Sequence, residues 1–160
     1  MFDFTVTDAK GTKYTLSELL KTKKAVVLNL WYTNCEPCKM EFPYLQKAYD
    51  EYKNDIALLA LDPIDSAEAV TTFAKNNGLT FPMMACDANW AQKANVTAYP
   101  TTIVIDRNGI VSLVHTGYID SSKTFKNIFA HFTAKDYKKG VVTDLKAFEA
   151  KDEDPAGSAN

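Results

Sequence analysis

Two cysteines, Cys35 and Cys38, stand three residues apart where an apolar run ends and a helical pattern begins. Residues three apart at a helix start lie on one face, so the two sulfur atoms are within reach of a reversible disulfide. The start of a helix also presents a partial positive charge and unpaired N–H groups, and both favour a thiolate. Because the thiolate attacks in disulfide exchange, the pair predicts thiol–disulfide redox chemistry.

The same two cysteines could instead form half of a zinc site or act as two structural thiols. A structural zinc site needs four ligands. The remaining candidates Cys86, His115 and His131 show no paired spacing, so we expect no metal. Cys86 itself is typical of a small buried apolar residue at a strand end, with a regulatory disulfide or a third redox thiol as the alternative.

The totals favour a single globular domain. The chain has 160 residues, of which 46% are hydrophobic, and a formal net charge of −2. This length is enough for a buried core. The charge, with Arg107 as the one arginine, argues against nucleic-acid binding. No apolar run approaches the ~20 residues that span a bilayer. The sequence opens without a secretory signal, so we expect either a cytosolic protein or one whose export segment lies outside this sequence.

Strand-like and helix-like stretches alternate along the chain, which predicts an α/β fold with a mixed central sheet flanked by helices. We expect an N-terminal hairpin from residues 4–6 and 13–14, and strands over residues 25–31, 56–61, 81–86, 101–105 and 110–116. We expect helices from residue 15 and over residues 37–53, 66–77, 89–95 and 121–138, with a weaker pattern over 142–150. Residues 1–140 would form one domain, and residues 141–160 a C-terminal helix and a disordered acidic tail.

Three local patterns add detail to these elements. Thr15 opens a capping-box spacing, which predicts that its side chain caps the first helix. Asn108-Gly109 is a strong signal for a tight hairpin. An apolar stripe along the helix over 121–138 predicts a core face rather than a docking surface, and it comprises Phe125, Ile128, Phe129 and Phe132.

A family resemblance accompanies these patterns. Residues 31–39, WYTNCEPCK, with Glu41-Phe42-Pro43 after them, resemble thioredoxin-fold proteins of the TlpA and ResA kind, which are related to the AhpC/TSA superfamily. Further landmarks of that family are Phe4-Thr5-Val6 with Asp8 and Gly11, Tyr99-Pro100-Thr101-Thr102, and Ile105-Asp106-Arg107-Asn108-Gly109. The resemblance covers roughly residues 2–132. It implies a thioredoxin-like fold with an N-terminal hairpin extension, and a bacterial thiol–disulfide oxidoreductase that is usually exported or tethered to a membrane.

The resemblance also implies roles for individual residues. Cys35 would be the exposed nucleophile, and Cys38 the buried thiol that resolves the mixed disulfide. Pro100 would be a cis-proline that faces the two cysteines and leaves the backbone of Tyr99 free to pair with a bound peptide. Four further residues would border the substrate groove or pack beneath the active-site loop, namely Trp31, Asn34, Glu36 and Pro37.

Proton handling is a separate question. Thioredoxin has a buried aspartate on its central strand, and Asn29 stands at that position here. ResA-like proteins carry a carboxylate after the next strand, where Asp65 aligns. We therefore hypothesise that Asp65 shuttles a proton to or from Cys38, with Asp62 as the rival. The alternative is that Asp65 only caps the helix that follows it.

The resemblance favours a protein that reduces the disulfides of other proteins. Glu36 supports this assignment, because a negative charge beside Cys35 disfavours its thiolate, and a less stabilised thiolate usually goes with a more reducing cysteine pair. The implied partners are protein disulfides and an upstream dithiol, and we expect a monomer. No cofactor, no nucleic acid and no membrane insertion by this segment are expected. Work of this family includes cytochrome c maturation and extracytoplasmic thiol maintenance. We therefore expect an extracytoplasmic protein, with the cytoplasm as the alternative.

Two other functions stay open at this point. A peroxiredoxin-like peroxidase shares the broader fold, but it needs a threonine three residues before its reactive cysteine and an arginine near the thiolate. Thr33 lies two residues before Cys35, and Arg107 lies in a predicted turn. A non-catalytic binding module is the other alternative, and the presence of Cys35, Cys38 and Pro100 argues against it.

Overall fold

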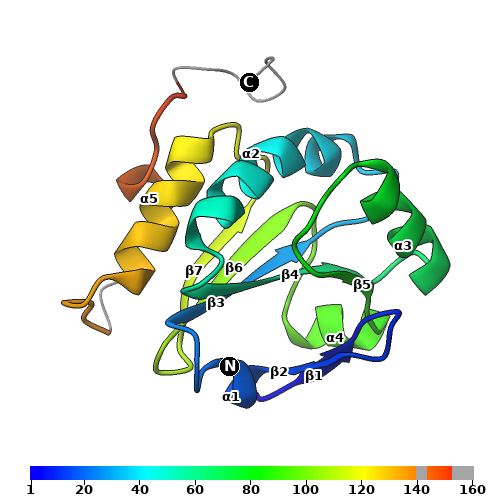
Figure 1. Ribbon diagram of the computed structural model, residues 1–160, viewed down its shortest axis with the longest axis horizontal. Helices are drawn as coiled ribbons and strands as arrows, with labels where there is room; N and C mark the ends of the chain where they lie inside the picture. The colour runs from blue at the N-terminus through cyan, green and yellow to red at the C-terminus, as the bar shows by residue number, and fades with distance from the viewer. Residues whose placement is uncertain (140–143, 153–160) are drawn as a thin grey trace.

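A mixed sheet of five strands forms the centre of the molecule. The computed structural model describes residues 1–139 and 144–152. The strand order is β5-β4-β3-β6-β7, with β3, β4 and β5 parallel, β6 antiparallel to β3, and β7 antiparallel to β6 (Figure 1). The strands are β3 (Ala25–Leu30), β4 (Ile56–Asp62), β5 (Met83–Ala85), β6 (Thr101–Asp106) and β7 (Val111–Thr116). The predicted α/β architecture is confirmed.

Helices cover both faces of this sheet. Successive side chains of a strand point to opposite faces, so each strand contributes to two separate core clusters. Ala25 and Val27 of β3 pack into one core cluster, whereas Val26 and Leu28 pack into the other. The first cluster lies under α2 (Glu36–Tyr52), α3 (Ala67–Asn76) and α5 (Ser122–Thr133). The second is covered by β1 (Thr5–Thr7), β2 (Lys13–Thr15), α1 (Leu16–Leu19) and α4 (Ala88–Lys93) (Figure 1).

The N-terminal hairpin forms as predicted, but the predicted capping box is wrong. Thr5 and Thr15 stand opposite each other in the β1–β2 register, and their hydroxyl groups hydrogen-bond to each other at 2.7 Å. The Thr15 side chain therefore makes no cap contact with α1. Asp3 caps this helix instead, since its carboxylate accepts the Ser17 N–H at 3.0 Å and the Ser17 hydroxyl at 2.8 Å. Thr15 therefore bonds across the hairpin to Thr5 instead of capping its own helix.

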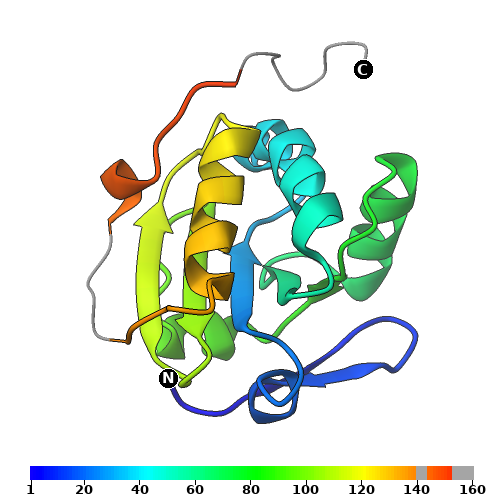
Figure 2. The same cartoon turned by 60° about the vertical axis from the view of Figure 1, so that its left-hand side comes forward.

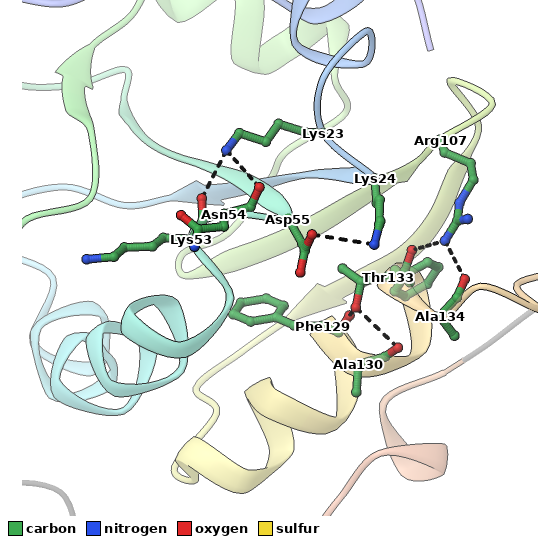
Figure 3. A network of polar contacts seen from close by, with 11 residues as sticks. Lys23, Lys24, Lys53, Asn54, Asp55, Arg107, Phe129, Ala130, Thr133 and Ala134 are labelled. Atoms are coloured by element: carbon green, nitrogen blue, oxygen red, sulfur yellow. Dashed lines mark hydrogen bonds and ion pairs between the residues drawn. The ribbon is translucent and has the colours of Figure 1, made fainter.

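Polar contacts tie the elements together at the end of the sheet where β3 begins (Figure 3). Arg107, in the turn between β6 and β7, donates from Nη2 to the carbonyl oxygens of Phe132 at 2.8 Å and Ala134 at 2.7 Å. Lys24 and Asp55 pair nearby at 3.5 Å. The helix predicted over residues 121–138 ends early, at Thr133, and Arg107 supplies donors to the carbonyl groups at its C-terminal end.

The C-terminal part differs most from expectation. Within the predicted helix over 142–150, the described residues form only a short 3₁₀ turn at Leu145–Ala147. Residues 144–152, called the C-terminal strap below, return along α5 (Figure 2). Asp152 makes hydrogen bonds to the start of that helix. The tail predicted to be disordered, residues 151–160, therefore holds one well-bonded residue, Asp152, and residues 153–160 lie outside the described residues. The domain limit at residue 140 stays a prediction, because residues 140–143 also lie outside.

Candidate active site

The two cysteines sit where β3 passes through a short loop into α2. Cys35 is the N-cap of α2, and it forms a disulfide with Cys38, with their Cα atoms 5.3 Å apart. The Cys38 N–H donates to the Cys35 Sγ at 3.3 Å. The helix start and this N–H both favour negative charge on Cys35 once the disulfide is reduced. The sequence-based prediction of a redox pair at a helix N-terminus is therefore confirmed in its geometry.

One expectation about these cysteines needs correction. The resemblance implied an exposed Cys35, but in the disulfide form Cys35 is only 4% exposed and Cys38 is 0% exposed. Both sulfur-bearing residues belong to the core cluster on the α2 side of the sheet. Cys35 remains the more accessible of the two, so an incoming thiolate has access to it rather than to Cys38.

The residues around the pair divide into buried and exposed ones. Trp31 is 0% exposed and packs its ring against Phe42 and Phe73. It therefore packs beneath the active-site loop, as the resemblance implied, and in this conformation it does not reach the surface where a substrate would bind. Three residues do lie at the surface beside the pair, namely Asn34, Glu36 and Pro37.

The charge of Glu36 is not free to act on Cys35. Its carboxylate pairs with the Lys39 Nζ at 2.6 Å, one turn along α2. The Glu36 side chain is 76% exposed, so solvent screens it further. The argument from sequence that Glu36 opposes the Cys35 thiolate is therefore weaker in the folded protein than it is in the sequence.

The loop before β6 carries the second landmark of the site. The peptide bond between Tyr99 and Pro100 is cis, as the resemblance implied. Pro100 is buried, and its carbonyl oxygen accepts the Gly117 N–H at 2.8 Å. The Tyr99 ring packs edge-on against Tyr32 of the active-site loop, with ring centres 5.5 Å apart. The tertiary fold thus brings together two loops that are 67 residues apart, counted from Tyr32 to Tyr99.

A buried carboxyl group lies on α2 one turn after the cysteines. Glu41 is 0% exposed and shares a helix face with Cys38. Its Oε1 accepts the Asn29 amide at 2.8 Å, and its Oε2 accepts the Ile119 N–H at 2.9 Å. Burial raises the pKa of Glu41 to about 7, although both hydrogen bonds act in the opposite direction.

Sequence reasoning assigned no role to Glu41. The available signal was its position three residues after Cys38, on the face of α2 that also carries the buried Phe42 and Leu45. A charged residue on such a face needs polar partners. Because one of those partners is the backbone of Ile119, far along the chain, the sequence could not identify it.

Asp62 and Asp65 form a second carboxyl group cluster at the end of β4. Asp62 is 0% exposed, and its Oδ1 accepts the N–H groups of Ile64 at 2.8 Å and Asp65 at 2.9 Å. The side chains of Asp62 and Asp65 also interact with each other. Burial, and then this interaction with Asp65, raise the pKa of Asp62. The same interaction lowers the pKa of Asp65, and burial opposes it.

Asp65 contacts the active-site loop rather than the sulfur atoms. Its Oδ2 accepts the Thr33 N–H at 2.8 Å. Within residues 1–139 and 144–152, no hydrogen bond joins Asp65 to either cysteine. It does not provide the side-chain cap of α3 either, because Ser66 does so by accepting the Ala69 N–H at 3.1 Å. The geometry identifies Asp65 as an anchor of the loop, and its proton-shuttle role stays a hypothesis.

Cys86 lies close to this carboxyl group cluster. It is half-buried, and its N–H donates to the Asp62 carbonyl oxygen at 2.8 Å. Burial, followed by the negative charges of Asp62 and Asp87, raises the pKa of the Cys86 thiol to about 12. A thiol of this kind carries its proton at neutral pH, so it is a poor nucleophile.

Comparison with known proteins agrees with this geometry. The model of the AhpC/TSA family matches residues 1–114. The chain belongs to this family. It is 39% identical over 117 residues to thiol-disulfide oxidoreductase ResA of Geobacillus kaustophilus, covering 72% of this chain and 66% of that protein. It is 36% identical over 122 residues to ResA of Bacillus subtilis, covering 75% and 67%. The match therefore spans about two thirds of each relative's length.

A solved structure supports the fold independently. A thiol:disulfide interchange protein from Chlorobium tepidum superposes with a TM-score of 0.73 at 24% identity, over 82% of this chain and 94% of that one. The protein thus has the thioredoxin-like fold that the resemblance implied. Together with the Cys35–Cys38 disulfide and the ResA relatives, this fold makes the chain a thioredoxin-like thiol–disulfide oxidoreductase.

The arginine that a peroxidase requires does not lie at this site. A peroxidase needs an arginine beside its reactive cysteine, whereas Arg107 lies at the opposite end of the sheet and binds two carbonyl oxygens of the α5 terminus. Among residues 1–139 and 144–152, no three histidine, cysteine or acidic side chains gather as metal ligands would. In that same part of the chain, no helix has the length and apolar character needed to cross a membrane.

Proposed function

We propose that this protein reduces disulfides of other proteins through a mixed-disulfide intermediate. The observation that carries the proposal is the Cys35–Cys38 disulfide at the N-terminus of α2. In the reduced protein, the Cys35 thiolate attacks one sulfur of the substrate disulfide. That S–S bond breaks, and the departing substrate thiolate takes up a proton. Cys38 then attacks the Cys35 Sγ, which releases the second substrate thiol and leaves the protein oxidised.

An upstream dithiol must restore the reduced pair, because each cycle leaves the two electrons of Cys35 and Cys38 with the substrate. The helix start and the Cys38 N–H stabilise Cys35 as a thiolate and as a leaving group. Lys39 contributes as well, since it neutralises Glu36, whose charge would otherwise disfavour that thiolate.

Glu41 is the best-placed group for the proton of Cys38. Cys38 must lose a proton before it can attack, and the Glu41 carboxyl group lies one turn away on the same face of α2. A pKa of about 7 lets Glu41 accept and return a proton near neutral pH. The hypothesis that Asp65 shuttles the proton is the alternative, and it would need a path that bypasses the Thr33 amide.

Substrate binding would use the exposed loops beside the pair. An extended peptide can add to the Tyr99–Pro100 loop, with the backbone of Tyr99 as its hydrogen-bond partner. The Tyr32–Tyr99 aromatic pair gives that peptide a semi-exposed apolar surface. Asn34 and Pro37 complete the rim on the side of α2.

The setting of this activity is part of the proposal. The ResA relatives are bacterial proteins, and the family resemblance favours an extracytoplasmic reductant that acts in cytochrome c maturation or in thiol maintenance. The protein would act as a monomer. Residues 1–140 would form the thioredoxin-like unit that carries the chemistry.

The proposal is tested by trapping the intermediate. A Cys38→Ser variant should accumulate mixed disulfides with its partners through Cys35, and a Cys35→Ser variant should accumulate none. Both are prepared with Cys86→Ala, so that the third thiol cannot contribute. The Cys35–Cys38 couple should have a reduction potential near that of thioredoxin, about −270 mV. A potential near that of a strong oxidant, about −120 mV, would contradict the reductant assignment.

A further inference from the structure

The C-terminal strap is fastened to α5 by an apolar anchor. Phe148 is only 6% exposed, and its ring contacts His131 and Phe132, with ring centres 5.3 and 6.3 Å away. The Asn127 side-chain amide donates to the Phe148 carbonyl oxygen at 3.0 Å. A buried phenylalanine and a satisfied carbonyl group make this a packed contact rather than a chance approach of a chain end.

From Phe148 the strap runs toward the start of α5 (Figure 2). Polar contacts hold it there. Thr124 and Ala150 bind reciprocally, since the Thr124 hydroxyl donates to the Ala150 carbonyl oxygen at 3.1 Å and accepts the Ala150 N–H at 3.0 Å. Thr124 is buried, and it lies in the first turn of α5. These two hydrogen bonds fix the position of the strap along the helix.

Asp152 completes the connection at the helix N-terminus. Its Oδ1 accepts the Ser121 hydroxyl at 3.0 Å and the Lys123 N–H at 2.9 Å. Its Oδ2 accepts the Ser122 N–H at 3.0 Å and the Ser122 hydroxyl at 2.8 Å. Burial alone would raise the pKa of Asp152, but the N–H groups of Lys123 and Ser122 outweigh it and lower the pKa. The carboxylate therefore stays charged and also complements the positive end of the helix dipole.

The segment just before α5 reaches the redox site. Ile119 stands two residues before Ser121, the N-cap of α5, and it is 3% exposed. Its N–H is the donor to the Glu41 Oε2 at 2.9 Å. The N-cap of α5 is thus separated by only two residues from the donor of the hydrogen bond on Glu41.

A pocket lies beside this connection. It has a volume of about 310 Å³ and lies between the segment around Ile119 and the strap. On its other side, Ile119 packs into the core cluster beneath α2 and α5. The segment is therefore held by this core packing, by Glu41 and by the capped start of α5, and only the strap side leaves it room to shift.

We propose that Asp152 is a positioning residue of the redox site, which holds the start of α5 and so keeps the Ile119 N–H on Glu41. This inference rests on the proposed proton role of Glu41 for its catalytic meaning, but its structural part stands alone. Asp152 lies beyond residues 1–114, the part of the chain that matches the family model.

The test removes the carboxylate and measures the titration of Glu41. In an Asp152→Ala variant, the Ile119 N–H should bind Glu41 less often, and the pKa of Glu41 should rise because that hydrogen bond lowers it. We expect an upward shift of about half a unit or more in the carboxyl carbon NMR titration. Tyr118, which interacts electrostatically with Glu41, titrates far above this range, because burial raises its pKa from 10.0.

Two further variants serve as controls. Asp144→Ala removes a carboxylate from the same strap at a position that makes no side-chain cap contact, and it should leave the titration unchanged. Asp152→Asn retains one oxygen acceptor and should give a smaller shift than Asp152→Ala. If Asp152→Ala lowers the unfolding midpoint but leaves the Glu41 titration within about 0.1 unit of the original protein, Asp152 only stabilises the fold and the inference is wrong.

A double variant separates this inference from the proposed function. Once Glu41 has been replaced by Gln, adding Asp152→Ala should cause no further change in the pH dependence of the rate at which Cys35 is alkylated. A further change there would show that Asp152 acts by another route, and would overturn the inference. If Glu41→Gln itself leaves the exchange rate unaltered, the proton role of Glu41 fails, while the NMR titration still decides whether Asp152 positions Ile119.

Discussion

Two carboxyl groups are buried at the redox end of the molecule, and the protein holds them differently. Glu41 has two partners, the Asn29 amide and the Ile119 N–H, and neither of them can ionise at neutral pH. Asp62 interacts with a second acid, Asp65, and this interaction shifts the pKa values of the two carboxyl groups in opposite directions. Burial raises the pKa of both Glu41 and Asp62, but only Asp62 has a neighbour that carries the negative charge in its place.

Because of this difference, we expect Glu41 to exchange a proton and the Asp62–Asp65 pair to have a structural role. A proton that leaves Glu41 leaves a buried charge behind, so it moves readily only when a nearby group, such as Cys38, changes its own charge. In the Asp62–Asp65 pair, the ionised member is the half-exposed Asp65, which holds the Thr33 amide. We therefore expect Glu41 to respond to the redox state of the cysteines and the Asp62–Asp65 pair to shape the loop.

The largest expected effect comes from replacing Glu41, the group that we propose exchanges a proton with Cys38. Glu41→Gln should slow the reduction of a protein disulfide by about a hundredfold near pH 7, the scale typical of a lost acid–base group. The amide should fit once the Asn29 amide turns over, since the glutamine oxygen can then accept the Ile119 N–H while its NH₂ donates to the Asn29 Oδ1. In the original protein, Asn29 presents its Nδ2 to Glu41 and its Oδ1 lacks a partner. Stopped-flow kinetics between pH 5 and 9 would measure the rate. An unchanged rate and pH profile would remove Glu41 from the mechanism.

A smaller effect should appear in the pH dependence of stability. The folded protein holds a proton on Glu41 up to about pH 7, whereas an exposed glutamate loses it near 4.5. Stability should therefore fall as the pH rises from about 4.5 to 7, by about 3 kcal/mol. Glu41→Gln should flatten that slope. Asp62→Asn should flatten it less, because the lowered pKa of Asp65 partly offsets the raised pKa of Asp62. Urea unfolding at pH 5 and pH 8 would compare the two variants.

The smallest effect is expected at Asp65. Asp65→Asn keeps a side-chain oxygen for the Thr33 N–H, so the exchange rate should stay within about threefold of the original protein. The pKa of Cys35, followed by alkylation, should also stay the same. A loss as large as that of Glu41→Gln would instead favour Asp65 as the proton shuttle and reverse the comparison between the two acids.

Local patterns predicted the elements well where near neighbours decide the structure. The run before Trp31 formed β3, and the Asn108-Gly109 signal formed the β6–β7 hairpin. The apolar stripe of α5 that begins at Phe125 is buried, as expected. These features depend on residues within a few positions of each other, and a periodic pattern records them.

Predictions failed where a distant partner replaced a local one. Thr15 caps nothing because Thr5 takes its hydroxyl group across the hairpin, and Asp3 takes over the cap. The last long helix ends early, where Arg107 of the β6–β7 turn meets its carbonyl groups. In each case a tertiary contact competed with the local pattern, and no sequence window contains both partners.

The sequence by itself determined the reactive chemistry, because two cysteines three residues apart at the start of a helix must share a face. It also determined which strand and helix carry them. Only the tertiary structure decided the surroundings of Glu41, the group that we propose exchanges a proton with Cys38, since Glu41 depends on Ile119, a partner 78 positions away. The acidity of a buried carboxyl group is set by its surroundings, and those surroundings exist only after folding has brought remote backbone groups into place.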